Sequence, residues 1–301
     1  MKILFMGANG TDYQSDCLIH GLYNLPNIEL INSPIALLMY KETFGEGKKN
    51  LSSVYGRGFT IYGTLPKYNH YEKEDVIDKI NNRYFDYVIF SHCYMEGIYH
   101  KEVLKKYDKK QIILIDGKDD TLIRNNYVDK AIYFKRELIK EHKNKKVIPI
   151  SFAFPEEKIQ TSLPKIRKDS LVKPTFQNSK KVSTYKYEIE QEYYNDYRQS
   201  LFGLTTKKAG WDCMRHYEIM ACRCIPYWRD MEQCPKTIAQ TIPKHIIRES
   251  NVWYGHSWEY YQTEQGNKEY HDLENKIFEH FKEHCTTKAL AQYVLDIMKS
   301  L

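Results

Sequence analysis

The densest group of chemically active side chains lies in residues 205–228, TTKKAGWDCMRHYEIMACRCIPYW. Apolar residues recur there at a three-to-four-residue spacing and predict a helix from about Cys213 to Cys222. Asp212, directly before it, is a residue type that caps helices, and the apolar IPYW after it predicts a buried strand. The stretch therefore predicts a loop, a capped helix and a turn into a strand.

Two kinds of polar group surround this predicted helix. The loop before it contains Lys207, Lys208 and Gly210, and the unpaired N–H groups and dipole at a helix start favour phosphate. Arg215 and Glu218 lie one turn apart on a face other than the apolar one, where the carboxylate can accept hydrogen bonds from ribose hydroxyls. The combination predicts a site for a nucleoside diphosphate, with a purely local Arg215–Glu218 ion pair as the alternative.

The same stretch contains enough cysteine and histidine to raise the question of a zinc site. Cys213 and His216 would share one side of the helix, but Cys222 would lie two turns away from them. With Cys224 as the fourth group, the spacing matches none of the usual structural zinc motifs. Ordinary buried thiols are the expected role, and the seven cysteines of the chain are expected to be free in a reducing setting.

Continuous apolar runs in the first half predict the strands that would position this site. They are KILFMG, NIELINSP, YFDYVIFSHCY, KKQIILIDGKDD, DKAIYFKREL and KKVIPISFAF. Because such runs alternate with helical patterns, they are typical of a parallel sheet that is covered on both faces. Residues 1–155 therefore predict a Rossmann-like α/β domain, followed by a polar linker over 156–185.

Residues 186–301 predict a second, shorter Rossmann-like domain, whose C-terminal helix can pack back on the first domain. A chain of 301 residues suits two domains of this kind. The fold class that we expect is α/β, with two Rossmann-like domains that face each other across a cleft.

Three loops that follow predicted strands could contribute to that cleft, since ligands of open parallel sheets gather at the carboxyl ends of the strands. The candidate groups there are Asp12, His92 and Asp116, with a structural turn, a hydrogen-bonded histidine and a solvated loop as the respective alternatives. Tyr94 and, in a glycine-rich segment, Arg57 are expected on the acceptor side. The carboxylates of Asp116, Asp119 and Asp120 could instead hold a divalent metal ion.

Composition limits the partners of the chain. The net charge of +6 is spread among acidic neighbours, so nucleic acid is not an expected partner. No apolar run approaches the ~20 residues of a membrane span, and MKILFMGANG lacks a secretory pattern. We expect a cytoplasmic protein with at most peripheral membrane contact. Its 26 tyrosines reflect either an AT-rich genome or a surface that stacks on sugars or bases.

The segment KKAGWDCMRHYEIMACRCIPYW resembles the donor-binding segment of GT-B glycosyltransferases, in a group-1-like subgroup from bacteria and large viruses. The likeness is specific over about residues 188–237. It implies that Glu218 binds the donor ribose or sugar and that Arg215, with Lys207 or Lys208, binds the diphosphate; the remaining implied donor-side residues are Gly210 and His216. Two features depart from the family: Arg223 replaces the usual glycine of the turn, and the second glutamate of the family pair is missing.

The residues and the resemblance together predict a metal-independent glycosyltransferase of the hexosyltransferase type, without a cofactor. It would move a sugar from a UDP- or GDP-sugar to a glycan or glycolipid acceptor. An inverting reaction needs a general base from the first domain, for which Asp12, His92 and Asp116 are the candidates. One alternative is a metal-dependent, GT-A-like transferase that uses Asp116, Asp119 and Asp120. The other is a non-catalytic protein that binds a nucleotide or carbohydrate.

Overall fold

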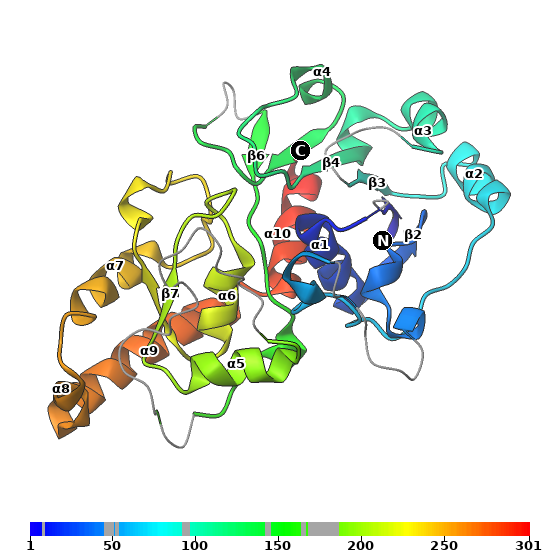
Figure 1. The fold of residues 1–301 in the computed structure, drawn as a ribbon. Helices are drawn as coiled ribbons and strands as arrows, with labels where there is room; N and C mark the ends of the chain where they lie inside the picture. Colours follow the sequence, from blue (N-terminus) through cyan, green and yellow to red (C-terminus); the bar gives the residue numbers. More distant parts are fainter. Residues whose placement is uncertain are drawn as a thin grey trace.

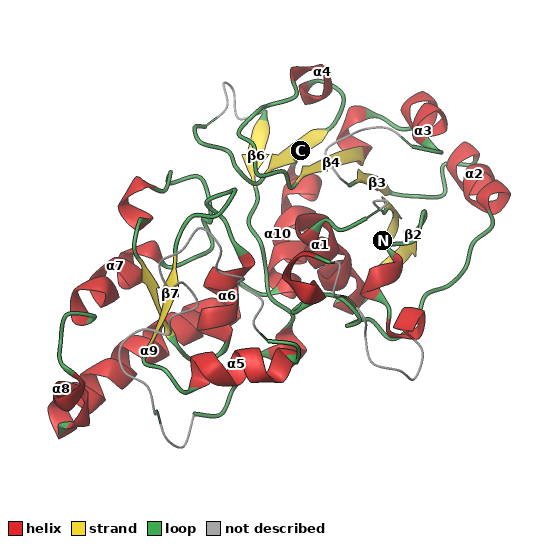
Figure 2. Cartoon of the chain, in the orientation of Figure 1, coloured by secondary structure: helices red, strands yellow, loops and turns green. Residues whose placement is uncertain are grey.

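The chain forms an α/β structure with two separate parallel sheets (Figure 1). This computed structural model describes residues 1–7, 10–44, 51, 54–91, 97–141, 146–163, 167 and 187–301. The colouring by secondary structure shows helices beside both sheets (Figure 2). The predicted α/β class with a parallel sheet is therefore confirmed.

The larger sheet contains six strands in the order β2-β1-β3-β4-β5-β6, all parallel. They are β1 (Lys2–Met6), β2 (Glu29–Asn32), β3 (Tyr87–Phe90), β4 (Ile112–Asp116), β5 (Ile132–Lys135) and β6 (Val147–Pro149). Each comes from one of the apolar runs of the sequence. The strand order reverses between β1 and β3, so the loops after these strands diverge and leave room for a ligand.

Helices cover both faces of this sheet, and the apolar residues alternate between two cores. One face packs against α1 (Tyr13–Asn24) and the C-terminal helix α10 (Thr287–Ser300); the other packs against α2 (Lys73–Asn81) and α3 (His100–Lys106). Gly21 permits the close approach of α1 and α10, because a Cβ atom there would lie 1.9 Å from the carbonyl oxygen of Thr287. A short helix, α4 (Asn125–Val128), precedes β5.

The second half of the chain has a smaller sheet, in which β7 (Phe202–Thr205) pairs with β8 (Ile225–Trp228). Its helices are α5 (Glu190–Arg198), α6 (Met214–Ala221), α7 (Lys244–Trp253), α8 (Trp258–Gln262) and α9 (Glu264–His284). Short 3-10 turns lie at η1 (Leu37–Met39), η2 (Lys41–Phe44), η3 (Tyr55–Gly58), η4 (Lys109–Gln111), η6 (Glu156–Lys158) and η7 (Met231–Gln233).

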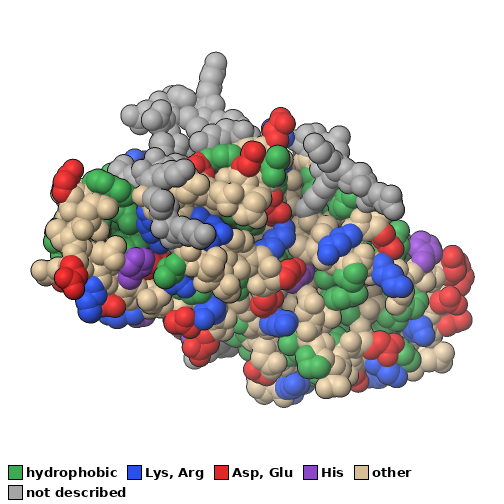
Figure 3. Space-filling model, turned by 90° about the horizontal axis from the view of Figure 1, so that it is seen from below, with side chains coloured by type: hydrophobic (Ala, Val, Ile, Leu, Met, Phe, Trp, Pro, Cys, Tyr) green, Lys and Arg blue, Asp and Glu red, His purple; other side chains and the backbone are tan. Residues whose placement is uncertain are grey.

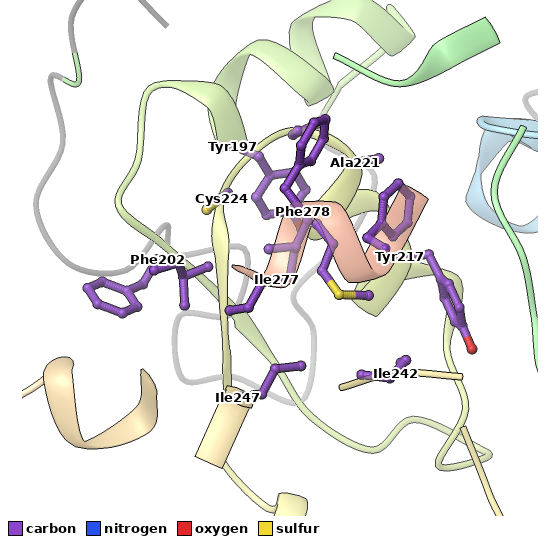
Figure 4. Close-up of a cluster of buried hydrophobic side chains, with 14 of the residues drawn as sticks. Tyr197, Phe202, Tyr217, Ala221, Cys224, Ile242, Ile247, Ile277 and Phe278 are labelled. Atoms are coloured by element: carbon purple, nitrogen blue, oxygen red, sulfur yellow. The ribbon is translucent and has the colours of Figure 1, made fainter. Parts of the chain in front are cut away.

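The core of this half is rich in aromatic side chains (Figure 4). Tyr197, Phe202, Tyr217 and Phe278 come from α5, β7, α6 and α9 and lie in one cluster. Buried tyrosine hydroxyls there have hydrogen-bond partners; Tyr270 Oη, for example, donates to the Leu201 carbonyl at 2.6 Å. Many of the tyrosines in the sequence are therefore core residues, and fewer of them remain for a stacking surface.

Arg223 stands where the glycosyltransferase segment that this chain resembles has a turn glycine, and it has a clear structural role. Its φ of 56° is in the left-handed region that usually favours glycine. The guanidinium Nε donates to the buried carboxylate of Glu274 on α9 at 2.8 Å and lies over the ring of Phe278. Glu274 also pairs with Arg167 and His271. Arg223 therefore fastens the turn between α6 and β8 to α9.

Two chain segments connect the two halves. Phe154 N–H donates to the Cys285 carbonyl at 2.9 Å, and Thr287 N–H donates to the Phe154 carbonyl at 3.0 Å. The chain thus leaves the first half after β6 and returns beside the same segment, where α10 packs on α1. On the face of the molecule in Figure 3, acidic and basic side chains are mixed and form no continuous positive patch.

Candidate functional site

A cavity of about 480 Å³ lies between the two halves of the chain. From the first half it is lined by the loops that follow β1, β4, β5 and β6, by the start of α1, and by η3 with the residue after it: Thr11, Asp12, Tyr13, Gly56, Phe59, Gly117, Lys118, Asp119, Arg136 and Phe152. From the second half it is lined by α5, α6 and the loop before α6: Tyr193, Lys208, Ala209, Gly210, Asp212, Cys213, Met214, Arg215 and Glu218. The cavity therefore brings together the carboxyl ends of the large sheet and the segment that drew attention in the sequence.

Glu218 is a buried carboxylate in the lining of this cavity. It lies in the middle of α6, and its side chain has two hydroxyl partners from different parts of the chain. Thr60 Oγ1 donates to Oε1 at 2.5 Å, and Tyr193 Oη donates to Oε2 at 2.7 Å. Burial raises the pKa of Glu218, while these two hydrogen bonds oppose the rise. The carboxylate is thus held in a fixed orientation and can accept further hydrogen bonds through its remaining lone pairs.

Two cations lie near Glu218 in the cavity wall. Arg215 is buried one turn before Glu218 on α6, and Lys208 belongs to the loop before the helix. Burial and the neighbouring charge of Arg215 lower the pKa of Lys208 to about 8, so it is still mostly protonated at neutral pH. Two partly desolvated cations at one wall make this part of the cavity suitable for an anionic group.

The loop before α6 differs from the prediction in how its N–H groups are used. The N–H groups of Trp211 and Asp212 donate to the two oxygens of Glu137, a buried residue that follows β5, at 2.9 and 3.0 Å. Lys207 N–H donates to Asp230, and the Lys207 ammonium lies over the Trp211 ring instead of lining the cavity. The anion-binding capacity of this wall therefore rests on Lys208, Arg215 and the start of α6.

Asp212 is not the helix cap that the sequence predicted. The helix begins at Met214 with Cys213 in the cap position, and no side chain caps it. The Asp212 carboxylate instead accepts from Phe152 N–H at 2.8 Å and from the Tyr217 hydroxyl at 3.0 Å. Burial raises its pKa to about 6. The cap prediction is wrong because Asp212 joins the two halves across the cavity, a partnership that local sequence does not reveal.

His216 is also placed differently from the prediction. It is fully buried, stacks on Trp228 with ring centroids 4.0 Å apart, and does not line the cavity. One ring nitrogen lies 2.9 Å from the Trp211 carbonyl and the other lies 2.9 Å from Thr205 Oγ1. The donor-binding role for His216 is therefore corrected: its ring supports the loop before α6 from behind.

Burial lowers the pKa of His216 from 6.5 to about 4, which predicts a measurable pH effect. Between these values the unfolded state binds a proton that the folded state does not, so this group destabilises the fold as pH falls from 6.5 toward 4. We expect the stability advantage of the wild type over His216→Gln to shrink by up to about 1.4 kcal/mol per pH unit across that window. Urea unfolding of both proteins at several pH values checks it.

Comparing the two proteins is necessary because Asp212 acts in the opposite direction. Its folded-state pKa, about 6, lies above the usual aspartate value of 3.8, so it stabilises the fold as pH falls through that range. This contribution is shared by both proteins and cancels in the difference. A stability difference that stays constant from pH 7 to 4.5 would show that His216 does not remain neutral in the folded protein.

The structure separates the candidate bases of the first half. Asp12 lines the cavity, and Ser15 Oγ donates to its carboxylate at 2.6 Å. Asp116 is fully buried and does not line the cavity; Lys135 Nζ lies 3.0 Å and Arg124 Nη1 lies 2.8 Å from its carboxylate. Because Asp116 lies away from the cavity and both of its carboxylate oxygens already contact buried cations, it is not retained as a candidate base.

The remaining predicted residues are distributed as follows. His92 and Tyr94 lie outside the described residues. Gly56 lines the cavity, whereas Arg57 does not and lies near Glu188 instead. Cys222 is buried in the hydrophobic core, which is the ordinary thiol role that the spacing predicted.

The carboxylates of the metal-dependent alternative are each paired with a cation. Asp119 bonds to Arg136, and Asp120 lies 3.0 Å from Arg124 and 3.5 Å from Lys135. Together with the buried pairs of Asp116, these contacts make a network of acids and bases and not a convergent set of oxygen ligands. This donor set does not fit a divalent cation.

Arg136 was not anticipated from the sequence, although it links both halves. Its guanidinium donates to the Gly117 carbonyl at 2.9 and 3.0 Å, to the Asp212 carbonyl at 2.5 Å and to Glu137 at 3.0 Å. Its position directly after a buried strand was a usable signal, because that is where the ligand-binding loops of parallel sheets begin. Thr60 and Tyr193, the partners of Glu218, carried no such signal.

The chain matches no protein-family model and no curated protein. In the part of the chain that the structure describes, none of the helices combines the length and apolarity that crossing a membrane requires.

Proposed function

We propose that the protein is a metal-independent GT-B glycosyltransferase whose nucleotide-sugar donor binds at α6, with the acceptor on the side of the large sheet. The observation that carries this proposal is the shared cavity, in which Lys208, Arg215 and Glu218 of the second half lie across from Asp12 of the first half. In this proposal the two halves correspond to the two Rossmann-like domains of the family. The two-stranded sheet of the second half would be a reduced form of the donor domain.

Each group has a chemical role in this proposal. The nucleoside diphosphate would leave as the bond between its oxygen and the sugar carbon breaks. Lys208 and Arg215 would neutralise its charge, so the reaction would not require a metal ion. Glu218 would accept hydrogen bonds from donor hydroxyls. Asp12 would accept the proton of the acceptor hydroxyl as that oxygen attacks the sugar carbon. The acceptor would be a glycan or glycolipid, reached from the cytoplasm with at most peripheral membrane contact.

A ligand panel followed by a transfer assay tests this proposal. Because a ligand that binds only the folded state stabilises it, UDP or GDP at about 100 times its Kd should add about 2.7 kcal/mol of stability. CMP and a non-nucleotide diphosphate serve as controls. Mass spectrometry would then detect sugar transfer from UDP- and GDP-sugars to glycan acceptors, with and without EDTA.

The outcomes separate the alternatives. Transfer that survives EDTA supports the proposal, and transfer that is abolished by EDTA and restored by Mn²⁺ supports the metal-dependent alternative. Nucleotide binding without transfer to any acceptor supports a non-catalytic binding protein. No stabilisation by any nucleotide contradicts the donor site and a nucleotide-binding protein, and leaves only the carbohydrate-binding form of the non-catalytic alternative.

A further inference from the structure

We propose that Thr60, which belongs to the first half of the chain, is a positioning residue for Glu218 and completes the donor site from the opposite side. The inference rests on the proposed function, in which Glu218 binds donor hydroxyls. It assigns a donor-side role to the glycine-rich segment that contains η3 and Thr60, for which the sequence predicted an acceptor-side role through Arg57.

The contacts of Thr60 are unusual for a loop residue. Its side chain is fully buried, and Oγ1 donates to Glu218 Oε1 at 2.5 Å. The same Oγ1 lies 2.9 Å from Tyr194 Oη on α5. Its backbone N–H donates to Glu190 at the start of α5, which also pairs with Lys158. A single residue of the first half is therefore held by three side chains of the second half.

The backbone of Thr60 supports a specific role. Its φ is 77°, in the left-handed region, where a β-branched residue is a genuine outlier. Such a conformation costs on the order of 1–3 kcal/mol and persists where the surroundings fix it, often at functional sites. Here the conformation directs the hydroxyl at Glu218 and the N–H at Glu190. Phe59, the preceding residue, lines the cavity.

The chemistry of Glu218 explains what Thr60 would contribute. A carboxylate accepts hydrogen bonds from ligand hydroxyls best when it is ionised and fixed in orientation. Burial raises the pKa of Glu218, and the hydroxyl of Thr60 opposes that rise. Since Tyr193 occupies the other oxygen, loss of the Thr60 hydroxyl would free Oε1 to rotate and would favour the protonated carboxyl.

Three variants test this role. Thr60→Val removes the hydroxyl and keeps the shape; Thr60→Ser keeps the hydroxyl; Thr60→Gly removes the hydroxyl and relieves the positive φ, so it remains informative if the valine variant does not fold. Two quantities are measured for each variant in the full chain. Calorimetry gives the Kd for UDP and GDP between pH 5 and 8, and carboxyl ¹³C NMR, assigned with Glu218→Gln, gives the pKa of Glu218.

We expect Thr60→Val and Thr60→Gly to raise the nucleotide Kd about tenfold or more, the usual effect of losing a hydrogen bond to a charged group. The pKa of Glu218 should rise in both variants, and the loss of nucleotide affinity at low pH should begin at a higher pH. Thr60→Ser should remain close to the wild type in both. Unchanged Kd and titration in the two hydroxyl-free variants would overturn the proposal, as would equal impairment of Thr60→Ser.

The two measurements keep this inference separate from the proposed function. If the wild type binds no nucleotide, the proposed donor site fails, and the inference that rests on it fails with it. If the wild type binds nucleotide and the pKa of Glu218 does not change when the Thr60 hydroxyl is removed, only the proposed role of Thr60 fails.

Discussion

Glu218→Gln is expected to lower sugar transfer by at least about 100-fold, because the neutral amide loses charge-assisted hydrogen bonds to donor hydroxyls that are each worth about 1.5–3 kcal/mol. The free energy of unfolding should change little by comparison. Gln has nearly the same shape, and its amide oxygen can still accept from one of the two hydroxyls that contact Glu218, those of Thr60 and Tyr193. Initial rates at saturating acceptor, together with urea unfolding, measure the two effects.

Glu274→Gln is the matched control for that variant. Glu274 is a second buried glutamate of the same half, but it pairs with Arg167 and Arg223 away from the cavity. The Glu274→Gln protein should be less stable than the wild type, since neutralising Glu274 leaves buried cations uncompensated. Its turnover per folded molecule should stay the same. If Glu218→Gln loses stability as Glu274→Gln does and keeps its turnover, then Glu218 is a structural residue and the donor site lies elsewhere.

Asp116→Asn should have the largest effect on folding. The ammonium of Lys135 is fully buried and lies 3.0 Å from the Asp116 carboxylate, and Arg124 adds a second cation at 2.8 Å. Removing the negative charge leaves both cations with less compensation, which typically costs 3–5 kcal/mol, so we expect the free energy of unfolding to fall by about that amount. Equilibrium urea unfolding gives the value directly.

Asp120→Asn is the control, because its half-exposed carboxylate joins the same cations at the surface. We expect a loss below about 1 kcal/mol there, as for other partly exposed ion pairs. Turnover per folded molecule should be preserved in both variants. If the Asp116→Asn protein is stable but has lost sugar transfer, or no longer responds to added metal, then Asp116 takes part in the reaction and is not only a structural residue.

Much of the fold follows from local patterns in the sequence. Six continuous apolar runs became the six strands of the large sheet, because strands that are buried on both faces are apolar at most positions. The helix predicted from about Cys213 to Cys222 spans Met214–Ala221. Its apolar spacing was sufficient to place Arg215 and Glu218 on it, and both line the cavity.

The partners of buried polar groups could not be predicted in the same way. Asp12 lies in the loop between β1 and α1 and Asp116 is the last residue of β4, yet only Asp12 lines the cavity. The difference arises because Asp116 is the register partner of Lys135 on β5, a pairing set by the sheet and not by neighbours in sequence. Asp212, Glu137 and Thr60 likewise bond across the two halves.

A crystal structure of the protein with UDP or GDP at saturating concentration tests the central claim most directly. The proposed site predicts the diphosphate beside Lys208 and Arg215 and the ribose or sugar hydroxyls on Glu218, within the cavity between the two halves. A nucleotide bound at another surface, or a cavity that stays empty at a concentration that stabilises the protein, would contradict it.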